Sequence, residues 1–177
     1  MNEPMESMIN ELRQEAVVTK RVLERIPENK LAWRPHDKSM SLGQLAFHVA
    51  GIPGDLARLA GLKEFDASQA SFNPANPETL GHILAKHESS IAFAEEYLRG
   101  LDNTSLAETW RLTLRGEEVF AIPRAAFIRS LMLNHWYHHR GQLSVYLRQV
   151  GVPVPSIYGP SADENPFAPQ RAAVASA

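Results

Sequence analysis

The chain contains no cysteine among its 177 residues. This absence excludes a disulfide framework, a thiolate metal site and a cysteine nucleophile supplied by the protein itself. A cytoplasmic location agrees with it, and the polar, acidic residues 1–6 are unlike a secretory signal peptide. No apolar run approaches the roughly 20 residues that a membrane span requires, so we expect no membrane association.

The sequence also lacks a strong excess of either charge. It holds 18 basic and 20 acidic residues, which give a formal net charge of −2. This balance provides no long-range attraction to nucleic acid, so we do not expect nucleic acid as a partner. The length is that of one domain and is sufficient to bury roughly 70% of the surface of the unfolded chain.

Hydrophobic residues spaced three or four apart predict four helices. Their expected ranges are about 5–26, 42–61, 77–99 and 123–150. Ser41 and Gln44 form a capping-box signature before the second helix, in which Pro53 should cause a kink or a break. Asn76 is the expected cap of the third helix, with Pro77 at its first position.

Two further segments follow a different pattern. Residues 63–76 are rich in Ser, Asn, Pro and Asp and predict a loop, whereas residues 110–122 alternate apolar and polar side chains around Gly116. The alternation predicts a short hairpin or extended crossover between the third and fourth helices. The sequence therefore predicts an all-α fold, a four-helix bundle with this crossover, and such bundles build metal sites from side chains on facing helices.

Three histidines carry the most chemical information. His135 and His139 lie four residues apart in the fourth expected helix, and His48 lies on the apolar stripe of the second. Residues at i and i+4 share one face of a helix, with Cβ atoms roughly 5–6 Å apart. A facing helix carrying His48 would complete a three-histidine metal site, which leaves a coordination position open for water or substrate.

Spacing leaves two alternatives open. The histidines can be core side chains bonded one by one to carbonyl groups, since each buried nitrogen without a partner costs about 1–3 kcal/mol. His138 is also in register with His135, because about 100° per residue places His139 about 40° to one side and His138 about 60° to the other. Spacing alone therefore favours His139 only mildly.

The other candidate residues indicate a function less specifically. Trp136 follows His135 where a zincin-type metalloprotease would carry a catalytic glutamate, so that class is excluded. Three histidines are interpreted as structural or solvated: His36, His82 and His87. Three polar residues could orient an acidic substrate or the metal ligands, although such residues more often bridge helices: Arg34, Arg140 and Gln142.

The segments around these histidines resemble a known family. They comprise residues 31–35 and 39–48 before and including His48, residues 134–143 around the histidine pair, residues 146–148, and the tail 154–164. Over about residues 5–166 the chain resembles the DinB superfamily, which includes the YfiT-like and bacillithiol transferase branches. The two histidine motifs are specific in combination, and neither is specific alone.

The resemblance implies a single DinB-like domain over residues 1–166, with a DinB/YfiT-like up-down-down-up bundle and commonly a homodimer, followed by a mobile tail at 167–177. It implies a divalent metal, zinc or nickel, bound by His48, His135 and His139, and it selects His139 over His138. Characterised branches transfer bacillithiol or mycothiol to electrophiles or isomerise maleylpyruvate. A low-molecular-weight thiol is therefore an expected co-substrate, beside a small-molecule substrate.

The expected function is a metal-dependent enzyme that activates a low-molecular-weight thiol or water, of the thiol S-transferase or hydrolase type. Its physical basis is that a metal ion lowers the pKa of a bound thiol or water, so that the anion is present near neutral pH. The alternative is a non-catalytic, metal-stabilised dimeric stress or binding protein, in which the fourth position is filled or inaccessible.

Overall fold

A computed structural model describes residues 3–70 and 75–168 of the chain. The fold is mostly helical and includes a small three-stranded sheet. The helices are α1 (Glu3–Leu23), α2 (Leu42–Ala60), α3 (Leu80–Arg99), α4 (Asn103–Ala107), α5 (Arg124–Phe127) and α6 (His135–Gln149). The strands are β1 (Glu64–Asp66), β2 (Thr109–Leu114) and β3 (Glu117–Pro123). Short 3-10 turns lie at η1 (Glu28–Lys30) and η2 (Ala67–Gln69), and a π-helical segment, η3 (Ile128–Asn134), joins α5 to α6.

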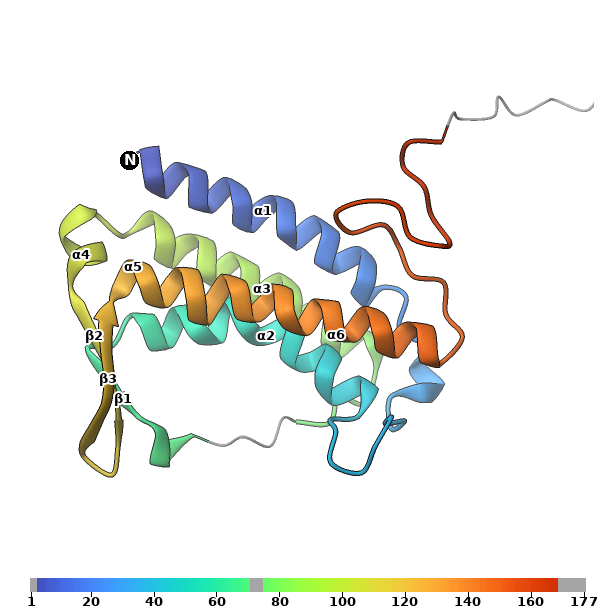
Figure 1. Cartoon of the computed structure of the whole chain (residues 1–177), viewed down its shortest axis with the longest axis horizontal. Coiled ribbons are helices and arrows are strands. Elements are labelled where there is room, and N and C mark those ends of the chain that lie inside the picture. The colour runs from blue at the N-terminus through green and yellow to red at the C-terminus, as the bar shows by residue number, and fades with distance from the viewer. Residues whose placement is uncertain (1–2, 71–74, 169–177) are drawn as a thin grey trace, which may run out of the picture.

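The core lies between the long helical segments. Figure 1 shows α1, α2, α3 and the continuous run α5–η3–α6 side by side, with the sheet at one end. Each long helix contributes side chains that are at most 1% exposed, such as Leu12, Leu45, Ile83 and Leu143. The all-α expectation is confirmed as a mostly helical fold, and the sheet is an addition to it. None of the described helices combines the length and the apolar character needed to cross a membrane.

Helix α2 begins as predicted. The Ser41 hydroxyl accepts a hydrogen bond from the Gln44 backbone N–H at 3.1 Å, and Gln44 Oε1 accepts one from the Ser41 N–H at 2.9 Å. This reciprocal capping box satisfies two N–H groups that lack partners inside the helix. The sequence predicted a kink or a break at Pro53. α2 does not break, because it continues from Leu42 to Ala60, and Figure 1 shows it bending along its length.

Side chains from two other helices stabilise α2 around the proline. Pro53 has no N–H to donate to the Val49 carbonyl, and that carbonyl accepts the indole N–H of Trp136 at 3.0 Å. The Gly54 N–H donates to Ser90 Oγ at 2.7 Å, and this hydroxyl donates to the Gly51 carbonyl at 3.0 Å. The helix therefore continues because α3 and α6 supply the missing partners.

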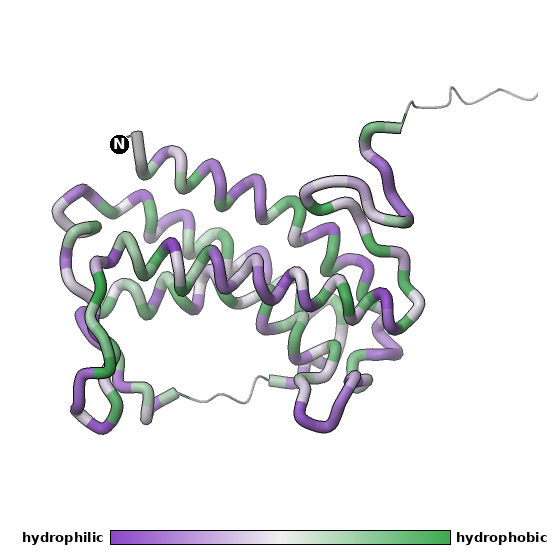
Figure 2. The backbone as a smooth tube through the Cα atoms, viewed as in Figure 1, coloured by the Kyte–Doolittle hydropathy of each residue, from purple (hydrophilic) through white to green (hydrophobic). Residues whose placement is uncertain are grey.

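The predicted hairpin is confirmed by the antiparallel pairing of β2 with β3, in which Leu112 lies opposite Phe120. Arg115 and Gly116 occupy its turn with φ angles of 54° and 85°, and Figure 2 shows this turn as hydrophilic. Two adjacent positive φ angles are typical of the tight turns whose twist matches that of paired strands.

The sequence did not predict strand β1, which lies within residues expected to form a loop. β1 pairs in parallel with β2, so that Phe65 lies opposite Leu112. The Asp66 carboxylate accepts hydrogen bonds from the N–H groups of Arg115 and Gly116 at 3.1 and 3.0 Å. Hydrogen bonds to this carboxylate, chiefly from Ser68, lower its pKa to about 2.

Helix α3 begins three residues later than the sequence suggested. Its cap is Thr79, whose hydroxyl accepts from the His82 N–H at 3.2 Å, so the prediction that Asn76 caps the helix is wrong. A side chain from outside the helix also favours this start, because Glu28 Oε2 accepts from the Leu80 N–H at 2.9 Å. The short helix α4, capped by Asp102, was likewise not predicted.

The segment after α6 contains no helix or strand up to residue 168, as expected. It is held against the helices by ion pairs from Arg148 to Asp163 at 2.5 Å and from Arg21 to Glu164. Residues 169–177, most of the predicted mobile tail, lie outside the described residues. The domain boundary at residue 166 stays a prediction.

Candidate metal centre

Three imidazoles from two helices meet on one side of the helical layer. His48 comes from α2, and His135 and His139 come from α6. The ring centroids lie 5.3 Å apart for His48 and His135, 4.6 Å for His48 and His139, and 4.5 Å for His135 and His139. One nitrogen from each ring lies within 4.8 Å of the other two. Small rotations of the rings would let one ion contact all three nitrogens.

The π-helical segment η3 sets the direction of His135, the first residue of α6. A π-helical turn holds more residues than an α-helical turn, so the faces of α5 and α6 do not follow a single 3.6-residue period, and such segments are frequent at functional sites. The ring of His135 also hydrogen-bonds the backbone of Leu131 inside η3. Burial lowers the pKa of His135, and this bond partly opposes that lowering by favouring the protonated ring. A bond with that effect is donated by a ring N–H, so the acceptor is the Leu131 carbonyl.

Burial favours the neutral form of all three rings. Each residue is half-buried, and loss of water is the main cause that lowers each pKa. The pKa of His48 falls to about 4, since repulsion from His139 and His135 adds to the effect of burial. Neutral imidazole is the form that binds a metal ion, so burial prepares these rings for ligation near pH 7.

A hydrogen bond defines which nitrogen of His139 is free. Its Nδ1 atom lies 2.7 Å from Oε1 of Gln142, one turn further along α6. An amide oxygen only accepts hydrogen bonds, so Nδ1 carries the proton and Nε2 keeps its lone pair. Partners of this kind orient metal-binding histidines and fix their tautomer. The donor set and its surroundings thus fit a divalent metal.

Comparison with known proteins identifies the family of the chain. Residues 1–171 match the DinB family. The chain belongs to the DinB family. It is 28% identical over 152 residues to the YrdA protein of Bacillus subtilis strain 168, covering 85% of each chain. It is also 28% identical over 141 residues to YjoA of the same organism, covering 76% of this chain and 82% of YjoA.

Solved structures show the same DinB-like fold. A DinB-like protein from Bacillus cereus ATCC 10987 superposes with a TM-score of 0.67 at 22% identity, covering 86% of this chain and 97% of that one. The Bacillus subtilis YjoA structure superposes with a TM-score of 0.63 at 19% identity, covering 83% of this chain and 95% of that one. These similarities establish the fold of the DinB-family chain.

The remaining histidines are not members of the three-histidine group in the DinB-family structure. His138 is exposed and is not one of the three grouped residues, although its ring centroid lies 5.0 Å from that of His139. His36 and His82 are also exposed. His87 is buried, and its Nε2 lies 3.1 Å from the Ala16 carbonyl, so it is a core histidine.

The three polar residues singled out in the sequence have different roles. Gln142 contacts a ring of the cluster, whereas Arg34 is exposed. Arg140 is 1% exposed and turns toward α1 and the C-terminal segment. Its guanidinium lies 2.6 Å from Glu15 Oε2, 3.1 Å from Thr19 Oγ1 and 2.5 Å from the Tyr158 hydroxyl. Arg140 therefore joins structural elements and does not extend into the histidine cluster.

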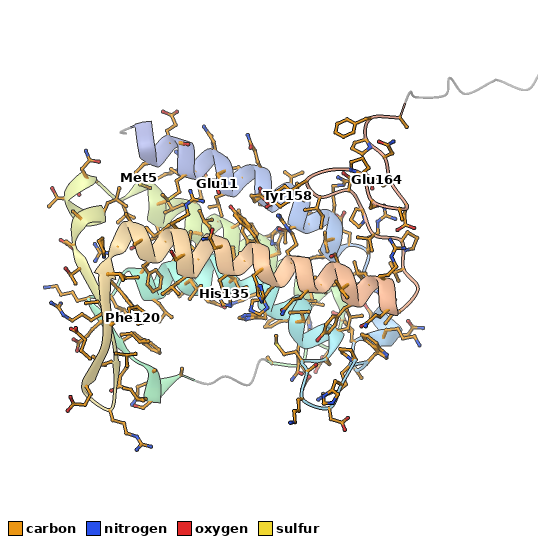
Figure 3. All side chains as sticks on the ribbon, in the orientation of Figure 1. Met5, Glu11, Phe120, His135, Tyr158 and Glu164 are labelled. Atoms are coloured by element: carbon orange, nitrogen blue, oxygen red, sulfur yellow. The ribbon has the colours of Figure 1, made fainter. Side chains whose placement is uncertain are left out.

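An apolar pocket of about 260 Å³ adjoins the cluster at His135. Its other lining residues are Leu56, Leu59, Phe65, Ala67, Trp110, Leu112, Phe120, Phe127 and Leu131. Figure 3 shows Phe120 on the hairpin and His135 on the long helical run, both toward the same side of the helical layer. Sequence reasoning missed this pocket, because its wall depends on the pairing of β1 with β2.

Proposed function

We propose that this DinB-family protein is a metal-dependent enzyme that activates a low-molecular-weight thiol or a water molecule at His48, His135 and His139. One observation carries the proposal: three half-buried imidazoles, each with a lowered pKa, converge within 4.8 Å from two helices. Burying three imidazoles so close together without a shared partner would leave several polar nitrogens unsatisfied.

The surrounding residues prepare the rings for ligation. Gln142 Oε1 accepts a hydrogen bond from Nδ1–H of His139, and the Leu131 carbonyl accepts one from a ring N–H of His135, which leaves the other nitrogen of each ring free to bind a metal. Trp136 of α6 is fully buried, and its indole N–H hydrogen-bonds the Val49 carbonyl of α2. This contact helps to hold α6 in place relative to His48. A divalent ion there would lower the pKa of a thiol or water, so that its anion is available near neutral pH.

The proposal includes several finer features. We take zinc or nickel as the metal, since imidazole ligands suit both. The nucleophile is a low-molecular-weight thiol of the bacillithiol or mycothiol kind, and the chemistry is S-transfer, with hydrolysis as its water-dependent form. We also propose that the protein is a cytoplasmic homodimer and that its fold is the up-down-down-up four-helix bundle. The side-by-side arrangement of α1, α2, α3 and the α5–η3–α6 run supports the bundle.

Metal analysis tests the ligand set. The purified protein should contain about one zinc or nickel ion per chain, and His48→Ala, His135→Ala and His139→Ala should each lower that content strongly. His138→Ala is the matched control, since this exposed neighbour lies outside the group and should leave the content unchanged. Full metal content in all three cluster variants would contradict the proposal.

An activity assay tests the chemistry and separates it from a purely structural role. Metal-loaded protein should consume a model electrophile in the presence of a small thiol faster than the His135→Ala variant does. Equal rates would contradict catalysis. If removal of the metal lowers the melting temperature and changes no reaction rate, the non-catalytic, metal-stabilised protein is the correct alternative.

A further inference from the structure

The wall of the apolar pocket comes from five parts of the fold. Residues of α2, β1, η2 and the β2–β3 hairpin surround it, and the α5–η3–α6 run bounds it on the side of the histidine cluster. The aromatic ring of Trp110 packs against Phe127 and Phe120, with centroids 4.4 and 6.1 Å apart. Aromatic side chains in such arrangements favour a further planar ring as a packing partner.

No lining side chain carries a charge, and His135 is the one polar residue among them. The indole N–H of Trp110 is already used, because it donates to the Leu59 carbonyl at 2.9 Å. An anionic group held in the apolar part of this pocket, away from the metal proposed at His135, would lose water and meet no cationic side chain among the lining residues. Burial of an unpaired charge is strongly unfavourable, so the apolar part of the pocket favours a neutral group over a carboxylate.

The pocket and the histidine cluster share one wall. Leu131 lines the pocket through its side chain, and its backbone hydrogen-bonds the ring of His135, which also lines the pocket. A molecule held in the pocket therefore lies beside the cluster. The volume of about 260 Å³ is slightly below the roughly 300 Å³ at which pockets for drug-sized ligands begin, which suits a single ring with small substituents.

We propose that the apolar pocket binds the electrophilic co-substrate, and that this electrophile is a neutral compound built on one aromatic ring. The proposal rests on the proposed function and adds the substrate class to it. With an aryl halide, the thiol sulfur forms a bond to the ring carbon, the carbon–halogen bond breaks, and halide leaves with the bonding electrons. The thiol proton passes to solvent, and the step requires no external oxidant or reductant.

Binding of two unreactive probes of similar shape tests the pocket without catalysis. Nitrobenzene and nitrobenzoate differ by one carboxylate, and each is titrated into metal-loaded protein by NMR. Nitrobenzene should bind more tightly by a factor of about ten or more, where a factor of ten corresponds to about 1.4 kcal/mol. Equal affinities, or a preference for nitrobenzoate, would overturn the substrate class.

A matched pair of variants locates the binding. Leu112→Arg places a cation on the pocket wall, so it should weaken the binding of nitrobenzene and strengthen that of nitrobenzoate. Leu114→Arg is the control, because it changes an exposed leucine two residues further along β2 and should alter the binding of neither probe. Ala67→Trp provides a second variant, which fills the pocket and should abolish binding of both probes. Unchanged probe affinities in Leu112→Arg and Ala67→Trp would overturn the assignment of the pocket.

Turnover separates this inference from the proposed function. The test reaction is consumption of chlorodinitrobenzene with glutathione as the thiol. Selective nitrobenzene binding without turnover would support the pocket and contradict the enzyme proposal. A different result would support the enzyme proposal and overturn the assignment of the pocket. In that result Ala67→Trp leaves the turnover rate unchanged, and neutral and carboxylated substrates have equal KM values.

Discussion

Trp136 donates its indole N–H to the carbonyl of Val49 at 3.0 Å, across the interface between α6 and α2. Pro53 leaves this carbonyl without its usual donor four residues later in the helix. A helical irregularity in α2 thus provides the anchor for the residue that follows His135. The interface that carries all three histidines is fixed by this contact.

Loss of the Trp136 hydrogen bond should destabilise the protein in a way that depends on Pro53. Trp136→Phe removes the donor and leaves a buried carbonyl unsatisfied, at a cost of about 1–3 kcal/mol. In a Pro53→Ala background the new N–H at residue 53 can bond Val49, so the same change should cost about 1 kcal/mol less. Urea unfolding of the four metal-free proteins measures the difference, and identical costs in both backgrounds would refute the coupling.

Gln142 should tune metal binding although it is not a proposed ligand. Gln142→Leu removes the acceptor that holds the Nδ1 proton of His139, and loss of such a partner typically weakens metal binding about 10–100-fold. Competition with a chromogenic chelator gives the dissociation constant. Gln149→Leu, an exposed residue of the same helix, is the control. A dissociation constant unchanged by Gln142→Leu would mean that the contact has no role in ligation.

Loss of the ion pair between Arg140 and Glu15 should lower the free energy of unfolding more than loss of an exposed ion pair does. Arg140 is 1% exposed and the Glu15 side chain is 15% exposed, so Glu15→Gln leaves a buried guanidinium without its counter-charge. Removal of one partner from such a pair costs about 3–5 kcal/mol. Glu88→Gln breaks the exposed pair with Lys20 and should have little effect. Chemical denaturation compares the two, and equal effects would contradict the prediction.

His87 should make the folded protein less stable as the pH falls. Burial lowers its pKa below 6.5, opposed by the Ala16 carbonyl and Glu88, while Lys20 reinforces the lowering. The unfolded chain therefore binds a proton first, and stability that is complete above pH 6.5 is lost as the pH decreases through the window below it. His87→Leu should reduce this loss relative to the wild type.

The measurement for His87 is the free energy of unfolding of metal-free protein between neutral and mildly acidic pH. The difference between His87→Leu and wild type isolates this residue from the three clustered histidines, which remain in both proteins. His82→Leu changes an exposed histidine of the same helix and serves as the control. Parallel pH profiles for wild type and His87→Leu would show that residue 87 does not contribute.

Local signals predicted much of the fold. The capping box at Ser41, the four main helical segments and the hairpin around Gly116 each depend on residues close together in the chain, and the structure contains all of them. The start of α3 was misplaced, because Glu28 supplies a partner to Leu80 from a distant segment. Of the kink or break predicted at Pro53, the break does not occur, since Trp136 and Ser90 supply hydrogen-bond partners from other helices.

The candidate site was likewise predicted from the sequence only where local signals specify it. Spacing brought His135 and His139 onto one face, and the apolar stripe indicated His48, which the structure places beside them. The choice between His138 and His139 came from the family resemblance, because the two positions differ little in register. The π-helical segment before His135 and the contribution of Phe65 to the pocket depend on tertiary packing and had no signal in the sequence.

The parallel pairing of β1 with β2 has a consequence for the order of folding. It joins Phe65 to Leu112, and the whole of α3 lies between them in the chain. Contacts between distant segments form slowly, because loop closure has a large entropic cost before the contact contributes any stability. Because β1 has only three residues and lies at the edge of the sheet, we expect it to dock late and to open more readily than the buried helices.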